Sequence, residues 1–176
     1  NENNIILICD EIYTGWYKTG HIFNFMSHGI LPDIVTTSKS FGGGKASISA
    51  YISRAPILKK AYGTNLRDAL LHTSTYNGFG EECATAIEAI NITQDENFEE
   101  KSFNIEKITK MRCKQLVENF SDQVKECLGS GALHGIFFKT DDLLIGKILK
   151  MVPISITKDD KFISKLAASA ISDWMY

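Results

Sequence analysis

Hydrophobic and polar positions in the first third of the chain follow the short patterns of strands, broken by one helical stretch. Residues 4–9 form a continuous apolar run rich in isoleucine, which predicts a buried strand of a parallel sheet covered on both faces. The pattern then predicts a short helix over residues 22–28, ended by Pro32, and a second strand over residues 33–37. Strands that alternate with helices in this way indicate an α/β fold.

The rest of the chain continues this order and then changes. A third strand over residues 48–53 leads into a helix that opens at Pro56, because proline fits the first helical turn. Two further helices follow, and a strand over residues 133–139 with two more helices predicts a smaller second lobe. We therefore expect three parts: residues 1–95 as part of a large domain, 96–128 as a long connecting helix, and 129–176 as part of a small C-terminal domain.

Both ends of the chain carry the patterns of interior segments. The sequence begins at Asn1 without a methionine and enters an apolar strand almost at once. At the other end a helical pattern continues to Tyr176 without a capping residue. We therefore expect the chain to be a portion of a longer protein.

Composition and charge exclude several classes of partner. The 176 residues are 44% hydrophobic and 23% charged, which is ordinary for a soluble globular protein. A formal net charge of −2, spread along the whole length, indicates neither nucleic-acid nor membrane binding. No apolar run approaches the roughly 20 residues that a membrane helix needs.

The cysteines indicate a reducing environment. The chain has four, Cys9, Cys83, Cys113 and Cys127, and they show no CxxC spacing. We therefore expect reduced thiols, no metal site and a cytoplasmic protein.

The first stretch with candidate chemistry is the acidic pair Asp10 and Glu11, at the carboxyl end of the first strand. Open parallel sheets place their ligands at this edge, so a functional carboxylate fits there. The alternatives are a solvated acidic turn, or the magnesium-holding strand of a nucleotide hydrolase. The second alternative needs a phosphate loop, and residues 38–45 fail that motif because Lys39 stands where glycine is required and Ala46 where a hydroxyl is required.

The second stretch is a lysine just past the second strand. Lys39 precedes three glycines, Gly42, Gly43 and Gly44, which let the backbone turn sharply and approach a ligand closely. Burial or nearby positive charge can lower a lysine pKa from about 10.4, and an unprotonated amine can form a Schiff base. The alternative is a surface lysine in a flexible loop, as we expect for Lys45.

The third stretch, residues 72–78, is rich in hydroxyl groups and lies ahead of a predicted helix. Hydroxyls and backbone N–H groups suit a phosphate, which a helix amino terminus also favours. The alternative is that these residues only cap the helix or form turns.

Together the three stretches resemble the class III aminotransferases, pyridoxal-phosphate enzymes of fold type I. The resemblance is carried by Asp10-Glu11-Ile12-Tyr13-Thr14-Gly15, Lys18-Thr19-Gly20, Pro32-Asp33-Ile34-Val35 and Ser38-Lys39-Ser40-Phe41-Gly42-Gly43-Gly44. Ser74-Thr75-Tyr76-Asn77-Gly78 resembles the later phosphate-contacting motif of that family. The resemblance covers residues 4–92 and extends only weakly beyond them. It implies part of a large domain with a mostly parallel sheet flanked by helices, followed by part of a smaller α+β domain.

The resemblance also implies a role for each site residue. Lys39 would form a Schiff base with pyridoxal 5'-phosphate and then shuttle a proton, and Asp10 would pair with the ring nitrogen. Ser74 and Thr75 would contact the cofactor phosphate, with Thr75 reaching the site of a neighbouring subunit in a homodimer. Tyr13 stands where many family members carry a glutamine near the ring hydroxyl.

The implied reaction is transfer of an amino group between an amine or amino acid and a 2-oxo acid. The partners are then these small molecules and a second subunit, with no nucleic acid and no membrane. The alternatives are an aminomutase, racemase or decarboxylase on the same scaffold, or a non-catalytic fragment. The family's phosphate loop and ring-stacking aromatic residue are expected upstream of this chain, and its substrate-carboxylate arginine downstream.

Overall fold

The computed structural model describes residues 5–63, 65–139, 162, 165, 168 and 169 of the chain. It has two compact units. The first holds the residues up to Asn104 together with Gly131–Leu133, and the second holds Ile105–Ser130 and the residues from His134 onward. Of the two helices predicted after residue 139, the structure describes only residues 162, 165, 168 and 169, which are helical, and the rest lies outside the described residues.

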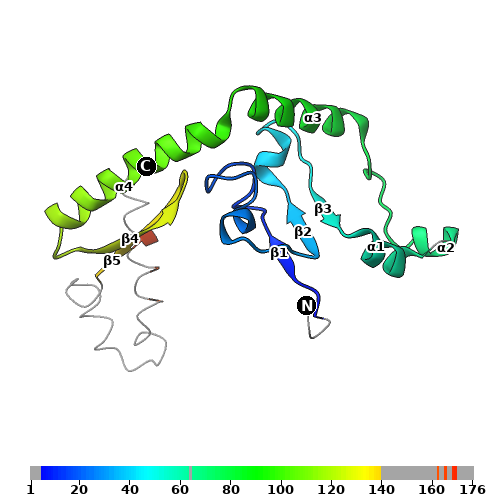
Figure 1. Cartoon of the computed structure of the whole chain (residues 1–176), viewed down its shortest axis with the longest axis horizontal. Helices are drawn as coiled ribbons and strands as arrows, with labels where there is room; N and C mark the ends of the chain where they lie inside the picture. Colours follow the sequence, from blue (N-terminus) through cyan, green and yellow to red (C-terminus); the bar gives the residue numbers. More distant parts are fainter. Residues whose placement is uncertain (1–4, 64, 140–161, 163–164, 166–167, 170–176) are drawn as a thin grey trace. The chain divides into compact units, whose positions relative to one another are not determined.

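The first unit contains a sheet of three short strands, β1 Ile8–Asp10, β2 Ile34–Thr37 and β3 Ala50–Ser53, in the order β1-β2-β3 (Figure 1). Strands β1 and β2 are parallel, as predicted, with Asp10 opposite Thr36. Strand β3 is antiparallel to β2, which the sequence pattern did not indicate. Because β1 and β2 run in the same direction, Asp10 and the residues after Thr37 lie at the same edge of the sheet.

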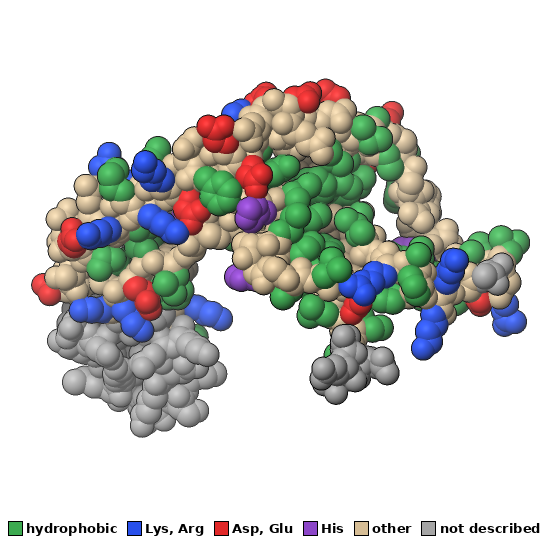
Figure 2. All heavy atoms as spheres, viewed as in Figure 1, with side chains coloured by type: hydrophobic (Ala, Val, Ile, Leu, Met, Phe, Trp, Pro, Cys, Tyr) green, Lys and Arg blue, Asp and Glu red, His purple; other side chains and the backbone are tan. Residues whose placement is uncertain are grey.

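The prediction of a buried strand over residues 4–9 is wrong for the chain as it stands. The strand begins only at Ile8, and the side chains from Ile5 to Ile8 are between 43% and 66% exposed. Among the described strands β1 pairs only with β2, so its apolar residues have little to pack against. Figure 2 shows apolar side chains gathered on the surface over this sheet.

The predicted helices of the first unit are present. They are η1 Asn24–His28, α1 Ala55–Tyr62 with Pro56 in its first turn, and α3 Gly80–Asp95. The structure adds a short 3-10 helix, η2 Lys39–Gly42, directly after β2, and one turn of helix, α2 Leu66–Ala69. The side chain of Asn65 caps α2, since its oxygen accepts a hydrogen bond from the Asp68 amide at 3.0 Å.

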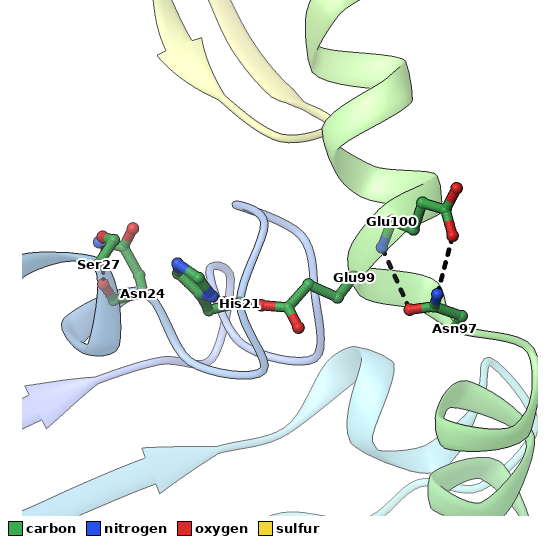
Figure 3. Close-up of polar contacts among 6 residues, drawn as sticks. All are labelled: His21, Asn24, Ser27, Asn97, Glu99 and Glu100. Carbon is green, nitrogen blue, oxygen red and sulfur yellow. Dashed lines mark hydrogen bonds and ion pairs between the residues drawn. The ribbon is translucent and has the colours of Figure 1, made fainter.

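The start of the long helix α4, Phe98–Asn119, is held by polar contacts within the first unit (Figure 3). The side chain of Asn97 accepts a hydrogen bond from the Glu100 amide and donates one to the Glu100 carboxylate at 2.9 Å. In the first turn of the helix Glu99 contacts His21 Nδ1 at 2.5 Å. The loop that follows β1 is therefore tied to the beginning of α4.

The second unit contains most of α4 and a two-stranded sheet of β4 Val124–Ser130 and β5 Leu133–Phe138. Strand β5 matches the predicted strand over residues 133–139. Strand β4 replaces the end of the helix expected over 96–128, which stops at Asn119. Its apolar residues at positions 124, 127 and 128 have helical spacing, so periodicity alone could not distinguish the strand from a continuing helix. The division into domains stays a prediction.

Candidate functional site

Asp10 lies at the carboxyl end of β1 with its carboxylate held on one side only. Its Oδ1 accepts hydrogen bonds from the Ile12 amide and from Thr36 Oγ1, each at 3.1 Å. Among the hydrogen bonds of the described residues none reaches Oδ2, and the side chain is exposed. Asp10 therefore offers a fixed, negatively charged oxygen at the edge where the parallel strands end.

Glu11, the next residue, is a structural carboxylate. Its side chain is buried, with 3% exposure. Its Oε1 accepts from the Phe25 amide at 2.9 Å, and its Oε2 accepts from the Asn24 amide at 3.1 Å and from the hydroxyl of Thr14. Glu11 thus ties the loop after β1 to the start of η1. The interpretation of the acidic pair as a solvated turn is wrong for Glu11.

Lys39 opens η2 in a strained backbone conformation. Its φ of 48° lies in the left-handed region, which costs a non-glycine residue about 1–2 kcal/mol. Such strain persists where the surrounding structure enforces it, and it concentrates at functional sites. Lys39 is therefore held in a defined place after β2, unlike a lysine in a flexible surface loop.

The amine of Lys39 lies over the ring of Tyr13, with Nζ 3.7 Å from the ring centroid. Tyr13 is 68% exposed, and Lys39 is exposed as well. Among the described residues no carboxylate forms an ion pair with Lys39. The structure therefore brings together Lys39 and Tyr13, and the strand register places Asp10 at the same edge.

Aromatic packing and one part-buried hydrogen bond support η2 from the loop after β1. Trp16 Nε1 donates to Thr37 Oγ1 at 2.6 Å, and the indole stacks on the ring of Phe41 with centroids 5.2 Å apart. On another side, Gly43 packs so closely on α3 that a Cβ placed there would lie 2.9 Å from the Cβ of Ala89. Sequence reasoning missed Trp16, although a tryptophan so near a predicted site was a usable signal.

Ser74 and Thr75 lie in the exposed segment between α2 and α3. The Ser74 carbonyl accepts from the Asn77 amide at 3.2 Å, which forms a turn. No hydrogen bond between described residues involves either side-chain hydroxyl, and the N-cap of α3 is Phe79, without a side-chain bond. These hydroxyls therefore do not cap α3, whereas the turn that the same alternative allowed is present. In the described part of the chain no contact joins Ser74 or Thr75 to the residues around Lys39.

One further reactive group, the thiol of Cys9, lies next to Asp10 in β1, and it is protonated. Burial raises the pKa of Cys9, and the negative charge of Glu11 raises it further. Cys9 therefore stays neutral beside Asp10 at neutral pH. Within the described residues no group of histidine, cysteine, aspartate and glutamate side chains can hold a metal ion.

The family model described as aminotransferase class-III matches residues 1–159 of the chain. The chain belongs to the class III aminotransferase family. Because the match extends from residue 1 to residue 159, the resemblance drawn from short motifs is confirmed over most of the chain. The roles of the five predicted site residues stay predictions; these residues are Asp10, Tyr13, Lys39, Ser74 and Thr75.

Solved structures of aminotransferases share the fold. Acetylornithine aminotransferase from Elizabethkingia anophelis is 26% identical with a TM-score of 0.70, over 84% of this chain and 37% of that one. Ornithine aminotransferase from Plasmodium yoelii is 25% identical with a TM-score of 0.71, over 85% and 39%. The ornithine aminotransferase of Toxoplasma gondii, whose structure has PLP at partial occupancy in the active site, is 26% identical with a TM-score of 0.69, over 85% and 34%.

These matches confirm the predicted α/β architecture of fold type I. The chain spans less than two fifths of the length of each of these three structures. A search of the described helices for one long and apolar enough to cross a membrane found none.

Proposed function

We propose that the protein containing this chain is a pyridoxal-phosphate-dependent aminotransferase, which moves an amino group between an amine or amino acid and a 2-oxo acid. The observation that carries the proposal is that two groups lie at one edge of a parallel strand pair. They are Lys39, an amine without an ionic partner among the described residues, and Asp10, a carboxylate with one open oxygen. The family match supports the same reaction.

The described residues fit pyridoxal phosphate. The amine of Lys39 can bond covalently to an aldehyde, and Oδ2 of Asp10 can accept a hydrogen bond from a protonated ring nitrogen. The phenol of Tyr13, beside Lys39, can donate a hydrogen bond to a ring hydroxyl. When bound, pyridoxal phosphate supplies an electron sink for a substrate carbon that loses a proton.

Lys39 and Asp10 then have separate tasks. With the cofactor bound, the Lys39 amine would take a proton from the substrate carbon and return it at a different atom, so that one lysine would serve as both base and acid. Asp10 would hold a proton on the ring nitrogen, and the two hydrogen bonds to its Oδ1 orient its carboxylate. The strained backbone at Lys39 fixes the starting point of the lysine side chain.

Ser74 and Thr75 complete the proposal as phosphate ligands of a neighbouring subunit in a homodimer. Their exposure and their lack of side-chain hydrogen bonds within the described chain support an intermolecular role. The division at residues 95 and 128 into a large domain, a connecting segment and a small domain is part of the same proposal. Four free cysteines support a cytoplasmic location.

The test is chemical labelling of the intact protein. Borohydride reduction should link the cofactor covalently to Lys39, as read by peptide mass spectrometry. Lys39→Ala should abolish both the link and amino transfer, whereas Lys45→Ala, a nearby lysine in the glycine-rich turn, should keep both. Labelling at Lys45 would overturn the assignment.

The type of reaction is tested separately by half-reactions. An aminotransferase should convert the amino donor to its oxo product without an acceptor, and then return the amino group to a 2-oxo acid added afterwards. Product formation in one step, with no need for an acceptor, would indicate an aminomutase, racemase or decarboxylase.

A further inference from the structure

A pocket in the second unit brings together two thiols from different elements. Cys113 lies on α4 and Cys127 lies in β4, and both line a pocket of about 390 Å³. The Cys127 thiol donates a hydrogen bond to the backbone carbonyl oxygen of Cys113, with Sγ 4.0 Å from that oxygen. Both side chains are half-buried, so the pair is accessible from the pocket. Two thiols this close differ from Cys9 and Cys83, which have no thiol neighbour in the described structure.

We propose that Cys113 and Cys127 form a redox-modification site, a dithiol that low-molecular-weight disulfides such as glutathione disulfide convert reversibly to an intramolecular disulfide. The proposal does not depend on the aminotransferase activity. Disulfides in reducing compartments are mostly transient, which suits a reversible modification better than a structural bridge.

Charged side chains surround the pocket in pairs. Lys110, Lys114 and Lys125 line it, and each forms an ion pair, with Glu106, Glu118 and Glu126 respectively. Because these charges balance one another, the proposed reactivity rests on the proximity of the two cysteines and on a proton acceptor in the pocket.

His134 provides a proton acceptor in the same pocket. Both of its ring nitrogens are buried, and neither has a hydrogen-bond partner among the described residues. A buried imidazole without partners is costly unless a polar group comes to it. His134 can therefore take the proton that a pocket thiol releases when it reacts.

The two thiols have different tasks in the exchange. The Cys127 thiol donates to the Cys113 carbonyl oxygen, and burial raises the pKa of Cys127. Cys127 therefore keeps its proton, and the first attack is assigned to Cys113, because the thiolate is the nucleophile in thiol–disulfide exchange.

The exchange then proceeds in two balanced steps. The Cys113 thiolate attacks one sulfur of glutathione disulfide, forms a mixed disulfide and expels one glutathione thiolate. Cys127 then loses its proton and attacks the Cys113 sulfur, which forms the Cys113–Cys127 bond and expels the second glutathione thiolate. The two protein thiols lose two electrons, and glutathione disulfide gains them.

The test uses the intact protein with glutathione disulfide, followed by quantification of free thiols and by peptide mass spectrometry. The wild-type protein should lose the thiols of Cys113 and Cys127 together, gain a Cys113–Cys127 linked peptide and recover fully with a dithiol reductant. Cys127→Ser should instead accumulate a stable glutathione adduct on Cys113, because the resolving thiol is gone. Cys113→Ser should form an adduct on Cys127 at least tenfold more slowly.

Cys83→Ser is the matched control, a half-buried cysteine of helix α3 without a thiol neighbour, and it should react like the wild type. Independent modification of the two cysteines, without a linked peptide, would overturn the proposal. So would equal rates of adduct formation in Cys113→Ser and Cys127→Ser, because the order of attack would then be wrong. The linked peptide is measured on the wild-type protein, and each variant replaces a single sulfur atom by oxygen. A folding defect in one variant therefore leaves the wild-type result and the other variant to decide.

Discussion

Two regions of the first unit carry predicted site residues, and they differ in how the chain holds them. At the edge formed by β1 and β2, buried polar contacts and aromatic stacking fix the loops around Asp10 and Lys39. In the segment between α2 and α3, residues 70–79 are all exposed, and the hydroxyls of Ser74 and Thr75 form no hydrogen bond within the described chain. Contacts within this chain thus fix the positions of Asp10 and Lys39. The proposed phosphate ligands, Ser74 and Thr75, have no such contacts, so their arrangement depends on a partner outside this chain.

Glu11→Ala tests whether polar contacts fix the edge formed by β1 and β2, and we expect it to have the largest effect on stability. Two backbone amides and the Thr14 hydroxyl would lose their acceptor, and each unsatisfied buried group costs about 1–3 kcal/mol. We expect the free energy of unfolding to fall by about 3–5 kcal/mol, measured by urea denaturation of the intact protein. Asp10→Ala is the matched control, and it should lower stability by less than about 1 kcal/mol because that carboxylate is exposed. Equal losses would mean that Asp10, too, is structural.

Substitutions of the glycines after η2 test how α3 supports the turn that follows Lys39, with a somewhat smaller expected loss of stability. Gly43 and Gly44 both have positive φ, 61° and 74°, but only a Cβ at Gly43 would meet another residue within 4 Å. Gly43→Ala should therefore cost about 2–4 kcal/mol, from backbone strain and from collision with Ala89, whereas Gly44→Ala should cost only the strain, about 1–2 kcal/mol. Thermal unfolding of the two variants measures the difference. If the two losses were the same, α3 would not support the Lys39 turn.

These glycines show what the sequence could and could not predict. Three consecutive glycines predicted a tight turn, which the structure confirms, and a close approach of the backbone to a ligand, which stays a prediction. The approach that it records is to Ala89 of α3, a residue far along the chain whose position no local pattern gives. The strands around Asp10 and Lys39, and the helices that follow them, were predictable because each has a local period or a breaking residue.

The errors share a physical cause. Burial of Ile5 to Ile8 depends on what covers β1, which is not encoded in the run itself. Strand β4 was missed because its apolar spacing suits a helix as well as a strand. Asp10 and Glu11 are neighbouring carboxylates that the sequence alone does not distinguish. Glu11 is structural and Asp10 is not, because the Asn24 and Phe25 amides lie where they can donate to Glu11. Local patterns predicted the elements, whereas long-range contacts decide which side chains are free.

Trp16→Phe should break one support of the Lys39 edge at moderate cost. Phenylalanine keeps an aromatic ring to stack on Phe41 but cannot donate to Thr37 Oγ1. We expect a loss of about 1–2 kcal/mol in unfolding free energy. The double variant with Thr37→Val, in a double-mutant cycle, should recover part of the loss because both partners of the hydrogen bond are then gone. Strict additivity would show that this hydrogen bond contributes nothing.

Thr75→Ala should have the smallest effect on stability, within about 0.5 kcal/mol, because the side chain is exposed and makes no hydrogen bond within the described chain. In the intact protein it should nevertheless weaken cofactor binding if the hydroxyl serves a neighbouring subunit.

Mixed dimers of Lys39→Ala and Thr75→Ala subunits show whether Thr75 serves its own subunit or the neighbouring one. If the sites are shared, one site of each mixed dimer combines an intact Lys39 with an intact Thr75, and amino transfer should recover to near the activity of one wild-type site. If each subunit supplies both residues to its own site, no intact site can form, and mixing should leave the activity at the average of the two variants.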